Sequence, residues 1–222
     1  MPNHCTNNVE VKLRAGATGN ALEVARKLTS FENIIPSPKE FEGIHSGGTR
    51  IEGIDTPAKA APYYGWDAIK GIGGEVKGTT FISFRLWREE GGDKTKPGKA
   101  VPITLEEANA MLAKYGCIGW YDWCNAYWGT KWNAYDVSEP RGTEKLAVIT
   151  FDTAWSPPTP VLEALAAMHP EMQITNRWRE EGGEKGNDKI APQSAEQLKA
   201  SAKASLDSYI AMTNRIRSSF GG

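Results

Sequence analysis

The sequence has no excess of one charge and no long apolar run. Among its 222 residues, 26 Lys and Arg balance 27 Asp and Glu, which leaves a formal net charge of -1. This balance provides no overall field that would attract nucleic acid or an anionic membrane, but it is compatible with a local basic patch. No apolar run approaches the roughly 20 residues of a membrane-spanning helix, so we expect no membrane partner.

Cysteine is also scarce, with Cys5, Cys117 and Cys124 as the three examples. An odd number of cysteines without disulfide-framework spacing is typical of a reducing compartment, where thiols stay free. The first residues are not followed by the apolar core of a signal peptide. We therefore expect a cytoplasmic protein.

The common catalytic motifs are missing. The chain contains no Gly-x-Ser-x-Gly, no His-Glu-x-x-His and no phosphate-binding Gly-x-x-x-x-Gly-Lys. No catalytic residue and no cofactor is predicted, and the hypothesis that this is not an enzyme is preferred.

Two groups of side chains carry atoms of the kinds that bind metal ions. The first is the pair of Glu-Glu-Gly-Gly turns at 89–92 and 180–183, which offer carboxylate oxygens. Adjacent residues on a strand point to opposite sides, so only one glutamate of each pair could face a shared ion. The second group is His4 with the three cysteines, but Cys117 and Cys124 lie too far apart in sequence for a usual zinc motif. Solvated turns and free thiols are preferred, and no metal site is predicted.

Tryptophan, in contrast, is concentrated in one segment. Four of the eight tryptophans fall between residues 120 and 132, interleaved with polar residues. Buried rings would make this segment the centre of a core, whereas exposed rings could form a recognition surface, and a mixture of both is expected. Asp152 and Trp155 follow a predicted strand and join the candidates, although an aspartate there is more typical of a turn. The predicted binding residues are Trp120, Asp122, Trp123, Asn125, Trp128, Lys131, Trp132, Asp136, Asp152 and Trp155.

The apolar periodicity predicts an α+β protein. Strands are expected at 9–13, 79–87, 146–151 and 172–178, where residues alternate or are rich in β-branched and aromatic types. Helices are expected after Asn20, a plausible N-cap, from Thr104 to residue 115 and from Thr159 to Met168. A long final helix opens at Ser194, and its apolar residues are Leu198, Ala202, Leu206, Tyr209, Ile210 and Ile216. Thr104 with Glu107 and Ser194 with Gln197 have the spacing of capping boxes. Long loops rich in glycine and proline are expected in the first half.

Three parts are expected along the chain. They are an N-terminal α+β portion (1–140) that holds the tryptophan segment, a portion at 141–191, and a C-terminal helix (192–222). The hexapeptide Trp-Arg-Glu-Glu-Gly-Gly occurs twice, at 87–92 and 178–183, each time at the end of a predicted strand. This repetition suggests two related α+β units.

Several of these motifs together resemble one protein family. The motifs are Asn-His-Cys-Thr-Asn at 3–7, Ile-Ile-Pro-Ser-Pro at 34–38, the tryptophan run at 120–132 and Phe-Asp-Thr-Ala-Trp-Ser-Pro-Pro at 151–158. They resemble the YubB-like proteins of bacteriophages and conjugative plasmids. The resemblance implies a ferredoxin-like fold for the 141–191 portion, with βαβ units on a mixed or antiparallel sheet, in a protein of a mobile element in a bacterial host cell.

Two functional hypotheses follow. The preferred one is an accessory binding protein that engages a host protein or small ligand, and in doing so counters a host defence system. The alternative is a protein that sequesters nucleotides, or an enzyme that acts on nucleotides or nucleic acid by stacking bases on its rings. Neutral net charge argues against general nucleic-acid binding. Whether the chain forms a homodimer is left open.

Overall fold

The computed structural model describes residues 3–51, 53–54, 57–64, 74–76, 79–81, 83–92 and 95–219. The chain forms two compact units. The first unit comprises the residues up to Ser37 together with those from Cys124 onward, and the second comprises Pro38–Trp123. Because the second unit interrupts the first in sequence, we call it the inserted unit.

The first unit is built on an antiparallel sheet with the strand order β10-β9-β1-β8-β7. Along the chain, its elements are strand, helix, two strands, helix and strand, followed by an added edge strand. These elements are β1 (His4–Leu13), α1 (Ala21–Arg26), β7 (Arg141–Gly142), β8 (Leu146–Ala154), α6 (Thr159–Met168), β9 (Met172–Glu180) and β10 (Lys185–Lys189). Two 3-10 helices, η1 (Lys27–Thr29) and η2 (Phe31–Asn33), follow α1.

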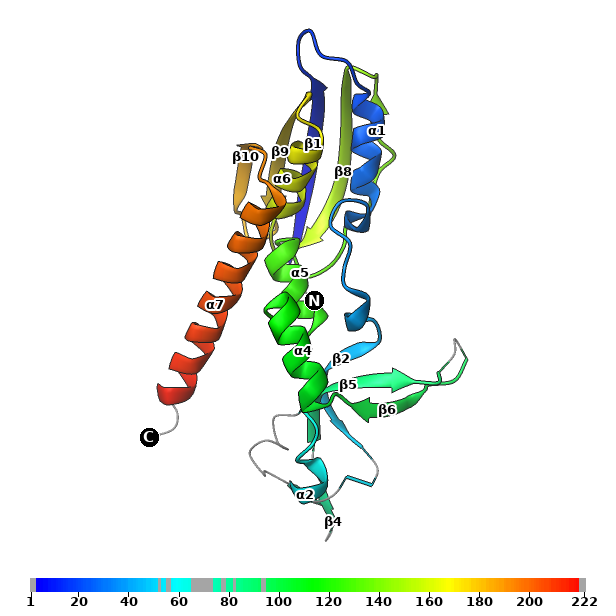
Figure 1. The fold of residues 1–222 in the computed structure, drawn as a ribbon. Helices are drawn as coiled ribbons and strands as arrows, with labels where there is room; N and C mark the ends of the chain where they lie inside the picture. The colour runs from blue at the N-terminus through cyan, green and yellow to red at the C-terminus, as the bar shows by residue number, and fades with distance from the viewer. Residues whose placement is uncertain are drawn as a thin grey trace. The chain divides into compact units, whose positions relative to one another are not determined.

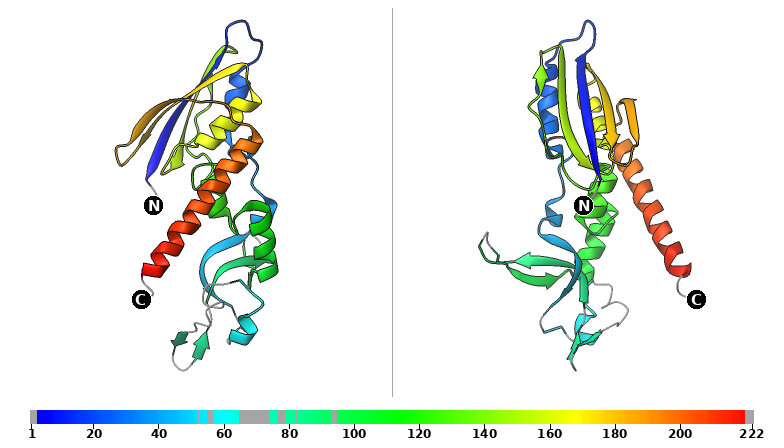
Figure 2. Two further views of the ribbon diagram at one scale, coloured as in Figure 1. Left: turned by 60° about the vertical axis from the view of Figure 1, so that its left-hand side comes forward. Right: turned by 180° about the vertical axis from the view of Figure 1, so that it is seen from behind.

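Both α1 and α6 lie on one face of this sheet, as the views from the front and from behind show (Figures 1 and 2). Alternation along β1 explains the arrangement: Cys5, Asn7, Val9 and Val11 are fully buried, and the residues between them are not. Alternate side chains of a strand point to opposite faces. The first unit therefore has a covered face, which holds its core, and an open face.

The helix ends agree with the sequence signals. The side chain of Asn20 accepts hydrogen bonds from the backbone N–H groups of Leu22 and Glu23, so the expected N-cap of α1 is confirmed. The final helix, α7 (Ala195–Ser219), begins with reciprocal bonds between Ser194 and Gln197. Ala202 and Leu206 are its buried residues, while the expected contacts of Tyr209, Ile210 and Ile216 lie outside the described side chains.

The inserted unit contains a three-stranded sheet, β2-β5-β6, and a two-stranded sheet, β3-β4. Phe84, Ala60 and Ile51 form its buried cluster. Residues 79–87, which were expected to form one strand, are divided between β4 and β5 in different sheets. Its elements are η3 (Lys39–Phe41), β2 (Ile44–Arg50), α2 (Pro57–Ala60), β3 (Gly74–Val76), β4 (Thr79–Phe81), β5 (Ser83–Glu90), β6 (Lys99–Pro102) and α4 (Leu105–Tyr115).

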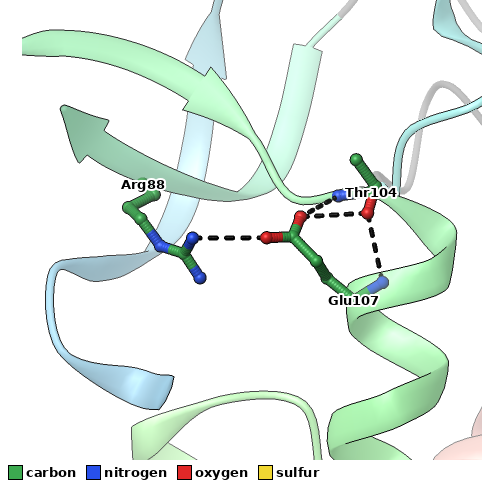
Figure 3. A network of polar contacts seen from close by, with 3 residues as sticks. All are labelled: Arg88, Thr104 and Glu107. Carbon is green, nitrogen blue, oxygen red and sulfur yellow. Dashed lines mark hydrogen bonds and ion pairs between the residues drawn. The ribbon is translucent and has the colours of Figure 1, made fainter. Parts of the chain in front are cut away.

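A complete capping box opens α4, as the sequence predicts. Glu107 accepts bonds from the backbone N–H and the hydroxyl of Thr104, both at 2.9 Å, and Thr104 accepts from the N–H of Glu107 at 3.1 Å (Figure 3). The Arg88 guanidinium donates to the other carboxylate oxygen at 3.2 Å. The backbone bond from Thr104 is the main cause that lowers the pKa of Glu107. Gly116 ends the helix in the left-handed conformation, with φ of 77°.

The compact units differ from the expected division at residues 140 and 191. Because β1 pairs with both β8 and β9, the N-terminal strand belongs to the same sheet as the 141–191 portion. The boundary between the units instead falls inside α5 (Trp120–Tyr127), after Trp123. The two copies of Trp-Arg-Glu-Glu-Gly-Gly do lie at strand ends, of β5 and β9, but in sheets of different topology. They are not equivalent positions of two repeated halves.

Candidate functional site

The first part of the tryptophan segment is buried. Trp123 and Trp128 retain only 3% and 4% of their surface. The Trp128 ring packs edge to face on Phe31 at 5.8 Å, and Phe31 packs in the same way on Phe151 of β8. The Trp128 indole N–H donates to the Ile35 carbonyl at 2.9 Å. This indole therefore belongs to the core on the covered face.

After Trp128 the chain passes the end of β8 and reaches the open side. The Thr130 hydroxyl is fully buried, donates to the Ala154 carbonyl at 2.9 Å and accepts from the Ala154 N–H at 3.1 Å. Asn133 then accepts from the Phe31 N–H at 2.8 Å and donates to the Ser30 hydroxyl at 2.9 Å. These bonds hold the segment on both sides of Trp132.

At this point two exposed indoles meet one lysine. Trp132 and Trp155 retain 39% and 42% of their surface. The Lys131 ammonium lies 4.6 Å from the centre of the Trp132 ring and 5.2 Å from that of Trp155, within cation–π distance of both. We call Lys131, Trp132 and Trp155 the aromatic–lysine cluster.

The backbone of Trp155 is strained. Its φ is +71°, a left-handed conformation that is uncommon for a bulky residue and unfavourable by roughly 1–2 kcal/mol. The backbone bond from its N–H to the Asn3 carbonyl, at 2.9 Å, helps to hold it there. Asp136 also has positive φ, at 49°, but it is an exposed aspartate, a residue type that tolerates this region.

Tyr135 connects the cluster to the open face. Its ring lies edge to face with Trp132 at 6.5 Å, and its hydroxyl lies 2.8 Å from Nδ1 of His4. Burial is the main cause that raises the pKa of Tyr135, and the Asp152 charge adds to the effect. Neither His4 nor Tyr135 was predicted as a site residue.

Asp152 lies in β8 rather than in the turn that was expected. It exchanges backbone hydrogen bonds with Tyr135, at 2.8 and 3.1 Å, and pairs with Thr6 of β1. The expected strand at 146–151 continues to Ala154, which places the Asp152 side chain on the open face.

A shallow hollow of about 570 Å³ adjoins these residues at the same end of the sheet. His4 and Thr6 of β1 line it together with Arg177 and Arg179 of β9. The alternation that buries Ile174 and Asn176 places Arg177 and Arg179 on the open face. This alternation is visible in the sequence and is the signal that could have predicted both arginines as residues of the open face.

The remaining predicted residues of the tryptophan segment belong to α5. Trp120 and Asn125 are partly buried there, and Trp120 packs edge to face on Tyr121. Asp122 is also partly buried, and this burial raises its pKa. The structure therefore brings Lys131, Trp132 and Trp155 together, but leaves the predicted residues of α5 outside that group.

Three of the four glutamates at the two turns accept hydrogen bonds from backbone N–H groups. Glu89 accepts from Gly98, Glu180 from Gly182, and Glu181 from His4 at 2.8 Å. None of the three cysteines, all of which the structure describes, forms a disulfide, and all are buried; burial raises the pKa of Cys5 to about 11 and that of Cys117 to about 12. Among the described residues, no three His, Cys, Asp or Glu side chains are placed to hold a metal ion.

Comparison with known families identifies the first unit's architecture. Residues 127–204 match the family model described as a ferredoxin-like domain in Api92-like protein. The chain contains a ferredoxin-like domain. The expected α+β class, with ferredoxin-like topology and a C-terminal helix, is confirmed. The match begins near the end of α5, while β1, which completes the sheet, and α1, which packs on it, come from the N-terminus.

Comparison with curated proteins and with solved structures finds no significant match to the chain. In the described part of the chain, no helix combines the length and apolar character that crossing a bilayer requires.

Proposed function

We propose that this protein is a non-enzymatic binding protein, and that the aromatic–lysine cluster of the ferredoxin-like domain is its recognition surface. The observation that carries the proposal is the pair of indoles, Trp132 and Trp155, each about two-fifths exposed around one lysine. Tryptophan is enriched among the residues that dominate binding energy at protein interfaces.

The backbone supports this assignment. An exposed tryptophan in the left-handed region lowers stability, and a strained residue is expected where function uses it. The hydrogen bonds of Thr130 and Asn133 fix the chain on both sides of Trp132 before any partner arrives. Rings that are already ordered lose little conformational freedom on binding, which favours affinity.

In this proposal the partner is a host protein or a small ligand, and the protein is an accessory factor of a phage or conjugative plasmid. The YubB-like motifs suggest that setting, and countering a host defence system is the role we propose within it. Phe-Asp-Thr-Ala-Trp-Ser-Pro-Pro, one of those motifs, contains Trp155 of the cluster.

The test is a double variant, Trp132→Ala with Trp155→Ala. A matched control, Leu112→Ala with Met168→Ala, removes two other large exposed side chains, at 46% and 49% exposure, from different helices. Partners captured by the wild type from bacterial host lysate are purified, and their dissociation constants are measured by calorimetry for all three proteins. Thermal-shift screening with small ligands uses the same three proteins.

Loss of a central interface tryptophan costs about 2 kcal/mol or more, which is about 30-fold in affinity. We expect the cluster variant to lose at least this factor and the control to bind like the wild type. If the cluster variant keeps full affinity for every purified partner, the proposed surface is wrong.

A further inference from the structure

The open face of the ferredoxin-like sheet carries a second set of side chains, beyond the aromatic–lysine cluster. Residues paired across a β-ladder point to the same face, so the register identifies them. One row crosses the whole sheet through Tyr135, Asp152, Thr6, Arg179 and Lys185, each paired with the next. The row thus runs from an aromatic ring at one edge to two cations at the other.

The next two rows continue the pattern. Arg177 pairs with Asn8 on one side and with Asn187 on the other, and Thr175 pairs with Lys189. On this face, the side chains within β9 and β10 include four cations and no carboxylate, while Glu181, directly after β9, lines the hollow beside Arg177 and Arg179. The cations are Arg177, Arg179, Lys185 and Lys189, and all four are exposed.

This local charge contrasts with the whole chain, whose net charge is -1. In the described part of the chain, none of the four cations forms an ion pair with a carboxylate. Two carboxylates of the open face, Glu10 and Asp152, lie on β1 and β8, and a third, Glu181, lies at the end of β9. Although the net charge of the chain is close to zero, these four cations form a basic strip along one edge of the sheet.

We propose that the open face binds a single-stranded nucleic acid, with the basic strip on its phosphates. Neighbouring strands lie about 5 Å apart and alternate residues of a strand about 7 Å apart, so the four cations form a staggered array over three consecutive rows. Such an array presents several positive charges to a chain of regularly spaced phosphates. Arg179 and Lys185 are paired in the first row, Arg177 lies in the second row opposite Asn187, and Lys189 lies in the third row opposite Thr175.

Neutral and aromatic side chains favour nucleic acid over other polyanions. Thr6, Asn8 and Asn187 lie in the same rows and offer hydrogen bonds to sugars and bases. The partly buried rings of His4 and Tyr135 lie at the far end of the first row, where a base could stack. A sheet with a basic edge and rings on its face suits splayed single strands better than a duplex, whose grooves admit a protruding helix or ribbon.

This inference goes beyond the proposed function and does not depend on the aromatic–lysine cluster, because it uses different side chains. The test measures fluorescence anisotropy of labelled 20-nucleotide oligo(dT) and oligo(rU) with the full chain at 50 and 200 mM salt. The variant is Arg177→Gln with Arg179→Gln. A control of equal net charge, Arg26→Gln with Lys199→Gln, removes two exposed cations from helices α1 and α7.

For four phosphate contacts, the affinity of a single strand falls about 50-fold between the two salt concentrations, and for two contacts about 7-fold. We expect the decrease of about 50-fold in affinity for the wild type and the control. The Arg177/Arg179 variant should show the decrease of about 7-fold, and it should bind at least tenfold more weakly than the wild type at 50 mM salt. A preference for oligo(dT) or for oligo(rU) would identify which nucleic acid is the ligand.

Three results would overturn the inference. The first is no binding of either oligonucleotide at 50 mM salt, and the second is an Arg177/Arg179 variant that binds like the control. The third is equal or tighter binding of duplex DNA, polyglutamate or phosphatidylserine vesicles, since the surface would then recognise duplex or general negative charge. The Trp132/Trp155 double variant separates the two proposals, because oligonucleotide binding should survive in it even if partner binding is lost.

Discussion

The two sides of the ferredoxin-like sheet use similar residues for opposite purposes. On the covered side, Trp128 donates its N–H to a carbonyl and packs on Phe31, which in turn packs on Phe151. Four residues later, Trp132 lies beside a lysine with 39% of its surface exposed. Composition alone cannot tell which of these indoles is buried and which is exposed. In the structure, the bonds of Thr130 to the end of β8 mark the point in the chain between the buried Trp128 and the exposed Trp132. The comparison teaches that an aromatic-rich segment can serve both the core and the surface.

The largest expected difference between the two sides is in stability. Trp128→Ala should lower the free energy of unfolding by about 3–5 kcal/mol, because it leaves a cavity against Phe31. Trp132→Ala should lower it by less than about 0.5 kcal/mol, as is usual for exposed positions. Urea unfolding followed by circular dichroism measures both. Equal losses for the two variants would break the comparison.

A buried polar group on the covered side should have the next largest effect. Asn7 is fully buried, donates to the Thr153 hydroxyl at 2.9 Å and accepts from the Asn176 amide at 2.9 Å. Asn7→Leu leaves the Asn176 amide without this acceptor, and should cost about 1–3 kcal/mol in chemical denaturation.

The matched control for Asn7 replaces both amides, as Asn7→Leu with Asn176→Leu. Apolar replacement of both partners can be nearly neutral, so this double variant should recover most of the lost stability. If it is less stable than the single variant, the amides stabilise the fold through contacts other than with each other.

On the open side, substitution of Trp155 should reveal backbone strain. Trp155→Gly and Trp155→Ala both remove the ring, but only glycine adopts the left-handed φ of +71° without steric penalty. We expect the glycine variant to be more stable than the alanine variant by about 1 kcal/mol in thermal unfolding. Both should lose partner affinity, whereas the opposite order of stability would mean that Trp155 is not strained.

The smallest effect is expected for a partly exposed charge in the inserted unit. The folded pKa of Glu107 is lowered, so its ionised form stabilises the fold above the unfolded pKa of about 4.3, and this contribution is lost as pH falls through the folded pKa. Glu107→Gln can keep the capping bond but loses the charge, and should cost less than about 0.5 kcal/mol at pH 7.

The pH dependence provides the check on Glu107. Denaturation at pH 7 and at pH 2.5 should show a difference between wild type and Glu107→Gln that shrinks in acid. A difference that grows in acid would have the wrong sign for a carboxylate with a lowered pKa.

Local sequence signals predicted local structure well. Asn20, the Thr104 and Glu107 pair and the Ser194 and Gln197 pair form the caps that their spacing indicates. These predictions succeeded because a cap depends on residues within one helical turn of each other. Which strands pair depends on residues that are distant in the sequence. The local pattern of residues 79–87 therefore could not predict their division between two sheets.

The sequence by itself determined the α+β class and the positions of the main helices. It also determined the alternation that places Arg177 and Arg179 on the other face of the sheet from Ile174. Only the tertiary structure decided that β1 lies between β8 and β9, that Pro38–Trp123 forms a separate unit, and that Trp128 is covered while Trp132 is exposed. The physical reason is that propensity and period act over a few residues, whereas burial depends on which distant elements pack against each face.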